Sequence, residues 1–134
     1  MNDRVSDRTF IFNEEIDTQC ITDLYGDDYA YVEEVFCTVL SEYDKLTENI
    51  LAAYGTGDLQ ALKSAVHKIK PVFGFVGLPA LQNQCQELEQ HCQSSSSFDQ
   101  IESDYISLKN KLIRSKSVIE EEKKKLDLFN RQRS

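Results

Sequence analysis

Residues 27–58 read DDYAYVEEVFCTVLSEYDKLTENILAAYGTGD, and this stretch decides the fold class. Its apolar side chains recur at steps of three and four residues, which is the spacing of one face of an α-helix. The repeating positions are Val32, Val35, Phe36, Val39, Leu40, Tyr43, Leu46 and Ile50. Gly55-Thr56-Gly57 stops the pattern, because glycine commonly terminates helices. The stretch therefore predicts a long amphipathic helix from Asp27 or Asp28 to about Tyr54.

The same spacing recurs in shorter stretches on both sides. Residues 17–24 indicate a short helix closed at Gly26, and Asp58 is placed to cap the helix that follows the long one. Pro79 stands where the first turn of a further helix tolerates proline, and a last helix begins near Phe98. The core positions expected on these three helices are Leu62, Val66, Ile69, Val72 or Phe73, and Val76; Leu81, Cys85, Leu88 and Cys92; and Ile101, Tyr105, Leu108, Leu112, Ile113 and Ile119.

The pattern as a whole predicts an all-α protein. No alternating run rich in β-branched residues is present, so a sheet has no candidate strands. Four long amphipathic helices joined by short turns pack best as an antiparallel, up-down-up-down four-helix bundle. We expect one domain over residues 1–134, with an irregular lead at 1–16, a short additional N-terminal helix and the bundle at about 27–128. The last helix is expected to outrun the bundle and to fray or project at its end.

Charge is unevenly distributed along the chain, whose formal net charge is −8. From Lys109 to Ser134 there are nine Lys and Arg against four Asp and Glu, so this end carries +5 and the rest of the chain −13. A body this acidic repels a phosphate backbone, which argues against nucleic-acid binding. We interpret the basic end as a solvated helix end.

The sequence shows no sign of membrane insertion or export. No apolar run approaches the roughly 18 residues of a membrane span, and the start lacks the apolar stretch of a secretory signal. We expect a cytoplasmic, monomeric protein, and Met1 favours a free-standing chain. The cysteines lack the paired spacing of a zinc site, so we expect no metal and interpret them as small, buried apolar residues. They are Cys20, Cys37, Cys85 and Cys92.

His67 is the main candidate for chemistry. It follows the core position Val66 by one residue, and a step of about 100° around the helix turns it away from the apolar stripe. Its neighbours on the helix surface are Lys63, Ser64, Lys70, Pro71 and Gly74. An unprotonated imidazole is a good nucleophile near neutral pH. Lys70 would favour that form and balance the charge of a phosphoryl group, and Gly74 leaves room for another protein to approach.

The stretch from His67 to Leu78, HKIKPVFGFVGL, resembles the signature of histidine-containing phosphotransfer domains. That signature is a histidine, a lysine three residues later, small residues next, and a glycine and a hydrophobe ten and eleven residues later. Gly55-Thr56-Gly57-Asp58, followed by Leu62, also resembles the family's lead-in to the histidine helix. The resemblance covers roughly Asp27 to Ser115, with a core of about twenty residues.

The resemblance implies a four-helix bundle in which His67 is the phosphoacceptor, carrying a phosphoryl group between aspartates of two receiver domains. It implies receivers of a hybrid histidine kinase or a response regulator, or both, as partners. The chain would be a phosphocarrier rather than an enzyme and would hold no cofactor, since Mg²⁺ belongs to the receiver. The residues expected to support the phosphoryl group or the docking partner are Lys70, Lys63, Ser64, Gly74 and Gly77.

Two positions depart from the family pattern. Pro71 stands where the family usually has glycine, and it has no N–H to donate to the carbonyl of His67. We expect a kink or a widened turn there, at a cost of roughly 3 kcal/mol if nothing compensates. On the next helix the family often has a glutamine near the histidine, whereas an ungapped match gives Glu89. A carboxylate there would repel a phosphoryl group, so we expect a shifted register or a Glu89 that points away, and leave Gln86, Glu89 and Gln90 unassigned.

A second class of function remains open on the sequence. The chain could be a non-catalytic helical adaptor that binds a signalling partner through one face of the bundle, with His67 incidental. Pro71, Glu89 and the long last helix favour that alternative. His91 has no such context and is interpreted as structural. A buried His67 ring would count against phosphotransfer, and an exposed one would favour it.

Overall fold

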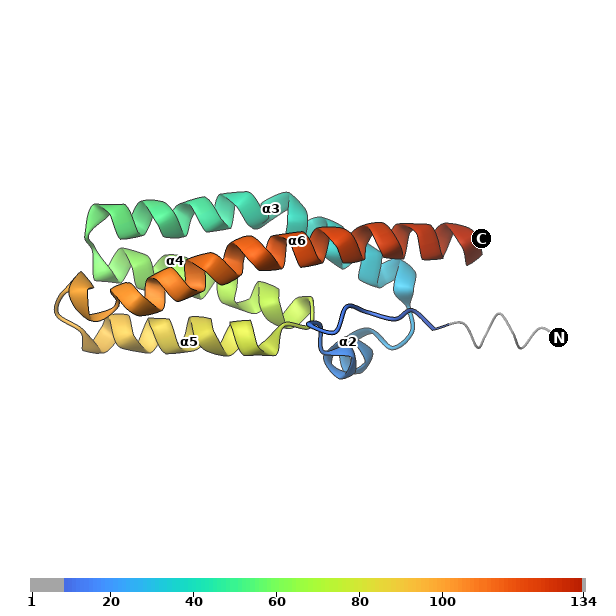
Figure 1. Ribbon diagram of the computed structural model, residues 1–134, viewed down its shortest axis with the longest axis horizontal. Coiled ribbons are helices and arrows are strands. Elements are labelled where there is room, and N and C mark those ends of the chain that lie inside the picture. The colour runs from blue at the N-terminus through green and yellow to red at the C-terminus, as the bar shows by residue number, and fades with distance from the viewer. Residues whose placement is uncertain (1–8, 134) are drawn as a thin grey trace.

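The computed structural model describes residues 9–133, and these form five α-helices, one turn of 3-10 helix and no strand (Figure 1). The elements are α2 (Thr18–Tyr25), α3 (Tyr29–Thr56), α4 (Leu59–Phe75), α5 (Pro79–Ser94), η1 (Phe98–Gln100) and α6 (Glu102–Arg133). The predicted all-α class is therefore confirmed. Within residues 9–133, no helix is both long enough and apolar enough to cross a membrane.

The helices α3 to α6 alternate in direction along one axis, as predicted for an up-down-up-down bundle (Figure 1). Each packs on its neighbour in the chain, and α6 closes the ring by packing on α3. The helices α3 and α6 are much longer than α4 and α5, so they continue together beyond the four-helix region, where α2 lies. The region that holds His67 is the part built from all four helices.

Most helix ends lie close to the positions that local sequence signals indicated. The start of the last helix differs, because Phe98–Gln100 forms the 3-10 turn η1 and α6 begins at Glu102 rather than near Phe98. The carboxylate of Asp28 accepts a hydrogen bond from the backbone N–H of Tyr31 at the start of α3, and Asp58 accepts from two N–H groups at the start of α4. Gly57, with φ of 74°, ends α3 in the left-handed conformation that glycine adopts without strain. Each side-chain cap stabilises its helix by about 1 kcal/mol. The first of these helices nevertheless includes Gly55, slightly beyond the predicted end.

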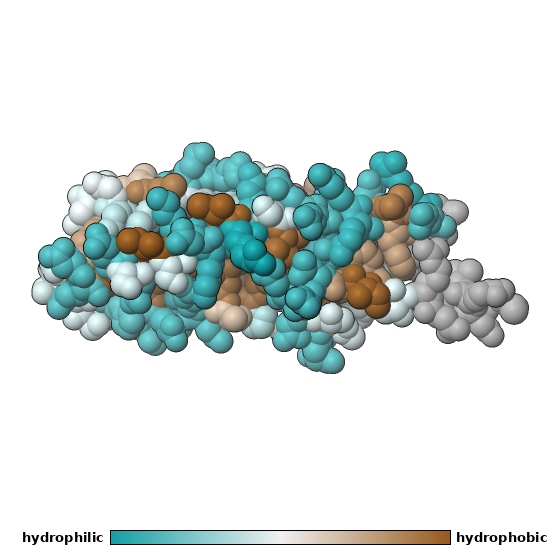
Figure 2. Space-filling view, in the orientation of Figure 1, coloured by the Kyte–Doolittle hydropathy of each residue, from teal (hydrophilic) through white to brown (hydrophobic). Residues whose placement is uncertain are grey.

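The core is formed largely by the predicted positions, with one clear error on α6. Ile113 is 62% exposed. Most buried positions of α6 alternate by four and three residues, and they form a narrow seam that Ile113 does not belong to. The seam begins at Ile101, just before the helix, and continues through Tyr105, Leu108, Leu112, Ser115, Ile119, Glu122 and Leu126, with Val118 also buried beside it. On the side that presents α6, the surface is mainly hydrophilic with separate apolar patches (Figure 2).

The described part of the lead, residues 9–16, has no helix but contributes to the core. Phe10, Phe12 and Ile16 are buried, and the ring of Phe10 packs edge-on against Phe129 near the end of α6. The last helix outruns the four-helix region, as predicted, and is helical to Arg133 (Figure 1). The lead and the start of α3 pack against it as far as Phe129 and Asn130. Residues 1–8 of the predicted lead lie outside the described residues.

Pro71 does not break its helix. The helix α4 is α-helix throughout from Leu59 to Phe75 with Pro71 inside it, so the predicted widened turn is wrong, and a kink stays a prediction. Pro71 lies on the exposed side, where water is available to the carbonyl of His67 that has lost its intrahelical donor. Exposure of this carbonyl to solvent is therefore what offsets the hydrogen bond that Pro71 cannot donate.

The turn between α4 and α5 generates a prediction about stability. Gly77 has φ of 75°, and a Cβ added there would lie 2.9 Å from the side chain of Ile16. We expect Gly77→Ala to lower the free energy of unfolding by about 1–3 kcal/mol, because it adds backbone strain and displaces the buried lead. Gly55→Ala is the control, since Gly55 is helical with open space at its Cβ and should gain roughly 0.5–1 kcal/mol. Urea unfolding measures both, and equal effects would contradict this account of Gly77.

Candidate functional site

A surface hollow lies between α4 and α5 at the position of His67. We call it the histidine hollow. Its lining is polar or charged throughout: Gln60, Lys63, Ser64, His67, Lys68 and Lys70 from α4, and Gln86, Glu89, Gln90 and Gln93 from α5. Three lysines and one glutamate give these residues a net positive charge without counting the histidine, although the whole chain is acidic. The hollow is therefore suited to an anionic group.

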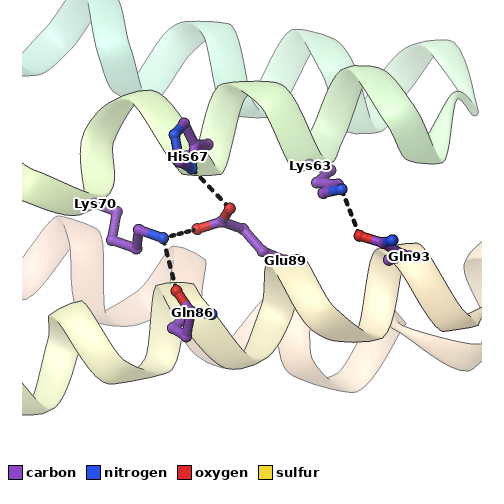
Figure 3. Close-up of polar contacts among 6 residues, drawn as sticks. All are labelled: Lys63, His67, Lys70, Gln86, Glu89 and Gln93. Atoms are coloured by element: carbon purple, nitrogen blue, oxygen red, sulfur yellow. Dashed lines mark hydrogen bonds and ion pairs between the residues drawn. The ribbon is translucent and has the colours of Figure 1, made fainter.

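The imidazole of His67 is both exposed and anchored. Its side chain is 68% exposed, and its Nδ1 atom lies 2.9 Å from Oε1 of Glu89 (Figure 3). An ionised carboxylate only accepts hydrogen bonds, so this contact requires the proton of the neutral ring to be on Nδ1. The other nitrogen, Nε2, then has the free electron pair. No described residue forms a hydrogen bond with Nε2.

Glu89 lies between the imidazole and a lysine. Its side chain is only 9% exposed, and its second oxygen, Oε2, is 2.7 Å from the ammonium of Lys70, which supplies the charge that a buried carboxylate needs (Figure 3). Lys70 also donates to Oε1 of Gln86 at 2.6 Å. Burial acts to raise the pKa of Glu89, but the hydrogen bonds and charges of Lys70 and His67 outweigh it and hold that pKa below its usual range. Glu89 is therefore a carboxylate at neutral pH.

These contacts correct the sequence interpretation of α5. Glu89 does not point away from the histidine, and no shift in register separates them. Gln86 contacts Lys70 instead of the ring. The signal that could have identified Glu89 is its position on the buried stripe of α5, four residues after Cys85 and three before Cys92. A charge on a buried face is rarely tolerated without partners, and the facing helix offers His67 and Lys70.

The other predicted site residues divide into two groups. Lys63 and Ser64 line the histidine hollow with His67, and Lys63 donates to the side chain of Gln93 across it (Figure 3). Gly74 and Gly77 are not part of its lining. A Cβ on Gly74 would lie 3.1 Å from the side-chain amide of Gln82 on α5, so this glycine leaves room for that side chain between the helices. Within this chain both glycines serve packing.

A second, apolar hollow lies further along the same exposed side of α4. His67, Pro71 and Phe75 follow each other at four-residue steps and are all exposed, so they form one stripe about 12 Å long. Phe75, which is 48% exposed, borders a groove between α2, α3 and the end of α4. We call it the α2–α4 groove, and its lining is Leu24, Tyr25, Tyr31, Glu34, Val35, Thr38, Val39 and Phe75.

The interpretation of the cysteines as buried residues is confirmed for two of the four and is wrong for Cys37, which is exposed, while Cys20 is partly exposed. Cys85 and Cys92 are buried between the helices, and burial, with the nearby charge of Glu89, raises the pKa of Cys85 to about 12. Its thiol is therefore protonated and packs as an apolar group. No group of three or more histidine, cysteine or acidic residues within the described part of the chain is arranged to hold a metal ion.

Comparison with known proteins assigns the family. The sequence model of the Hpt domain matches residues 34–117, which include α4, α5 and the histidine hollow. The chain belongs to the Hpt domain family. Proteins of this family are phosphocarrier modules that take part in histidine phosphotransfer within two-component phosphorelays.

A solved structure shows the same fold. It is the HPt domain of an Hpt sensor hybrid histidine kinase from Shewanella, with a TM-score of 0.67 and 22% sequence identity, over 78% of this chain and 88% of that chain. At this identity the likeness concerns the arrangement of the helices alone. The comparison with curated proteins gave no match.

The contact between His67 and Glu89 predicts which ring nitrogen carries the proton. Nitrogen–proton NMR correlation spectra of the neutral ring should show the proton on Nδ1, because Glu89 accepts it there. Glu89→Ala should lose this signature, whereas Glu89→Gln should keep it, since the amide oxygen still accepts. A ring protonated on Nε2 in the unmodified protein would contradict the proposed orientation.

Proposed function

We propose that His67 is the phosphoacceptor of this Hpt domain and that it exchanges a phosphoryl group with aspartates of receiver domains. The observation that carries the proposal is the exposed imidazole whose Nδ1–H is held by Glu89, because this leaves Nε2 as a free nucleophile facing solvent. The positive charge of the histidine hollow supports the same role, since it favours an incoming phosphoryl group.

The transfer step needs no group on this chain beyond the histidine hollow. The electron pair of Nε2 attacks the phosphorus of a receiver's aspartyl phosphate, the P–O bond breaks, and the aspartate leaves as a carboxylate. The ring becomes a phosphoimidazolium that keeps its Nδ1 proton beside Glu89, while Lys70, Lys63 and Lys68 lie near the new negative charge. In this proposal the receiver binds the Mg²⁺, and the chain acts as a carrier without turnover of its own.

The partner surface would include both the histidine hollow and the α2–α4 groove. The groove offers exposed Leu24, Tyr31 and Phe75, and the stripe from His67 to Phe75 joins it to the acceptor. A distance of about 12 Å lies within the area that one protein contacts on another. Aromatic side chains in such a position are typical of the energetically important part of an interface. We therefore propose that a receiver covers both.

The adaptor alternative has lost most of its support. Two of the features that favoured it, Glu89 and the long last helix, are explained by the contact with His67 and by the covering of α6 by the lead. The ring of His67 is exposed, which is the outcome expected for phosphotransfer. An adaptor in which His67 is incidental gives no reason for a buried carboxylate to orient an exposed imidazole.

The acceptor assignment predicts the result of a labelling experiment. When the chain is incubated with phosphorylated receiver domains, label should appear on it that is labile in acid and stable in base. His67→Gln should abolish the label, because its side chain has no nucleophilic nitrogen. His91→Gln is the matched control and should leave the label unchanged, although His91 also contacts a carboxylate, that of Asp104. Label that survives the loss of His67 would sink the assignment.

The proposed docking surface predicts a separate effect on affinity. Phe75→Asp places a charge at the mouth of the α2–α4 groove and should raise the Kd for a receiver about tenfold or more. Ile113→Asp is the control, since Ile113 is similarly exposed but lies on α6, outside both hollows. Calorimetric titration of each variant with a receiver tests this. Equal affinities for both variants would place the docking surface elsewhere.

A further inference from the structure

Glu89 is the one acidic side chain that lines the histidine hollow, and it touches the ring directly. A neutral glutamine, the residue often found here in the family, could accept the same hydrogen bond from Nδ1–H. The glutamate therefore adds a negative charge without adding a contact to the ring. That charge is partly buried and requires Lys70 as a counter-ion, so it carries an energetic cost that a glutamine would avoid. The negative charge of Glu89 therefore affects the ring of His67 in a way that is separate from the orientation of the ring.

The charged and titratable groups around this pair can be named from both helices. From α4, Lys70 contacts the carboxylate of Glu89, while Lys63 and Lys68 line the hollow. From α5, the buried thiols of Cys85 and Cys92 lie near Glu89, and burial and the charge of that carboxylate raise their pKa, so they stay protonated. Gln86, Gln90 and Gln93 complete that side without charge. Among these groups, Glu89 is the one that carries a negative charge, and it contacts Nδ1 of His67 directly.

We infer that Glu89 is a positioning residue that keeps phosphorylated His67 in its transfer-ready form by holding a proton on Nδ1 through its negative charge. The inference rests on the proposed function of His67. Before phosphorylation the carboxylate selects the tautomer. After phosphorylation it stabilises the positive charge that the ring acquires, at a contact of 2.9 Å in the unphosphorylated protein.

The chemistry of the second transfer explains why this proton matters. When a receiver's aspartate or a water molecule attacks the phosphorus, the P–N bond breaks and its electron pair stays on Nε2. If Nδ1 is protonated, the ring leaves as neutral imidazole, and no further proton transfer is needed. If Nδ1 has lost its proton, the ring must leave as an imidazolide anion, which is a far poorer leaving group. Keeping the Nδ1 proton at higher pH therefore extends the range in which the phosphoryl group can move on.

The substitution Glu89→Gln separates charge from orientation. The amide retains size, shape and an acceptor oxygen, so the Nδ1–H tautomer of the free ring should persist. Without the negative charge, the phosphorylated ring loses its Nδ1 proton more easily and therefore at lower pH. Glu87→Gln is the matched control, because it removes one negative charge from the same helix at a position that lines a different hollow, beside α6.

The test measures loss of the phosphoryl group without any receiver. The full chain is phosphorylated with phosphoramidate, the label at His67 is defined as that absent from His67→Gln, and its first-order hydrolysis is followed by phosphorus NMR across neutral and alkaline pH. We expect the pH midpoint at which hydrolysis slows to fall by about one unit in Glu89→Gln, giving roughly tenfold slower loss above both midpoints. Glu87→Gln should follow the unmodified protein.

The outcomes separate this inference from the proposed function. An unchanged midpoint in Glu89→Gln, or an equal shift in Glu87→Gln, overturns the role of Glu89. A ring that takes no phosphoryl group from phosphoramidate also overturns it, since Nε2 is then not the reactive atom that the role requires. Absence of transfer from receivers, measured separately, bears on the proposed function alone. A downward shift confined to Glu89→Gln supports the inference, because a merely structural role of Glu89 would not move the pH profile.

Discussion

The packing of α4 against α5 is the constraint on which the rest of the site depends. The two antiparallel helices bury an apolar seam that includes Val66, Ile69 and Phe73 on one side and Cys85 and Leu88 on the other. A residue just outside that seam on α4 is exposed, while a residue at the edge of the seam on α5 reaches across it. His67 and Glu89 occupy these two positions, so the rigidity of the seam sets the distance between ring and carboxylate.

A carboxylate at the edge of an apolar seam is tolerated only because its partners are assembled by the same packing. Removing a carboxylate from water costs several kcal/mol in general, and partners of opposite charge must offset it. Lys70 supplies that charge from the facing helix, the neutral ring of His67 donates a hydrogen bond, and Gln86 accepts one from the ammonium. The contacts that stabilise the buried carboxylate of Glu89 therefore also leave Nε2 of His67 available for reaction. His67, Lys70 and Glu89 contribute both to stability and to the proposed chemistry.

Contacts of the lead and of α2 with the end of α4 place the α2–α4 groove beside the stripe that begins at His67. The lead covers α6 through buried aromatic rings, and Asn13 donates its backbone N–H to the fully buried carboxylate of Glu122 at 2.8 Å. The backbone N–H of Asp17 then donates to the carbonyl of Gly77, and the hydroxyl of Tyr25 donates to that of Phe75. These contacts tie α2 to the end of α4. The groove is therefore built by the lead and α2 as much as by the bundle.

The sequence by itself determined what depends on local periodicity. The apolar steps of three and four, the cap at Asp58 and the exposure of His67 one residue past Val66 all follow from local helix signals, and the structure agrees with them. For the long helix the sequence left Asp27 and Asp28 open, and the structure has Asp28 as the cap. Only the tertiary structure decided which residues of different helices meet. The contact of Glu89 with the ring, the exposure of Ile113 and the covering of α6 by the lead depend on rotation and register between helices. Those are set by the summed packing of the core, which no single stretch of sequence contains.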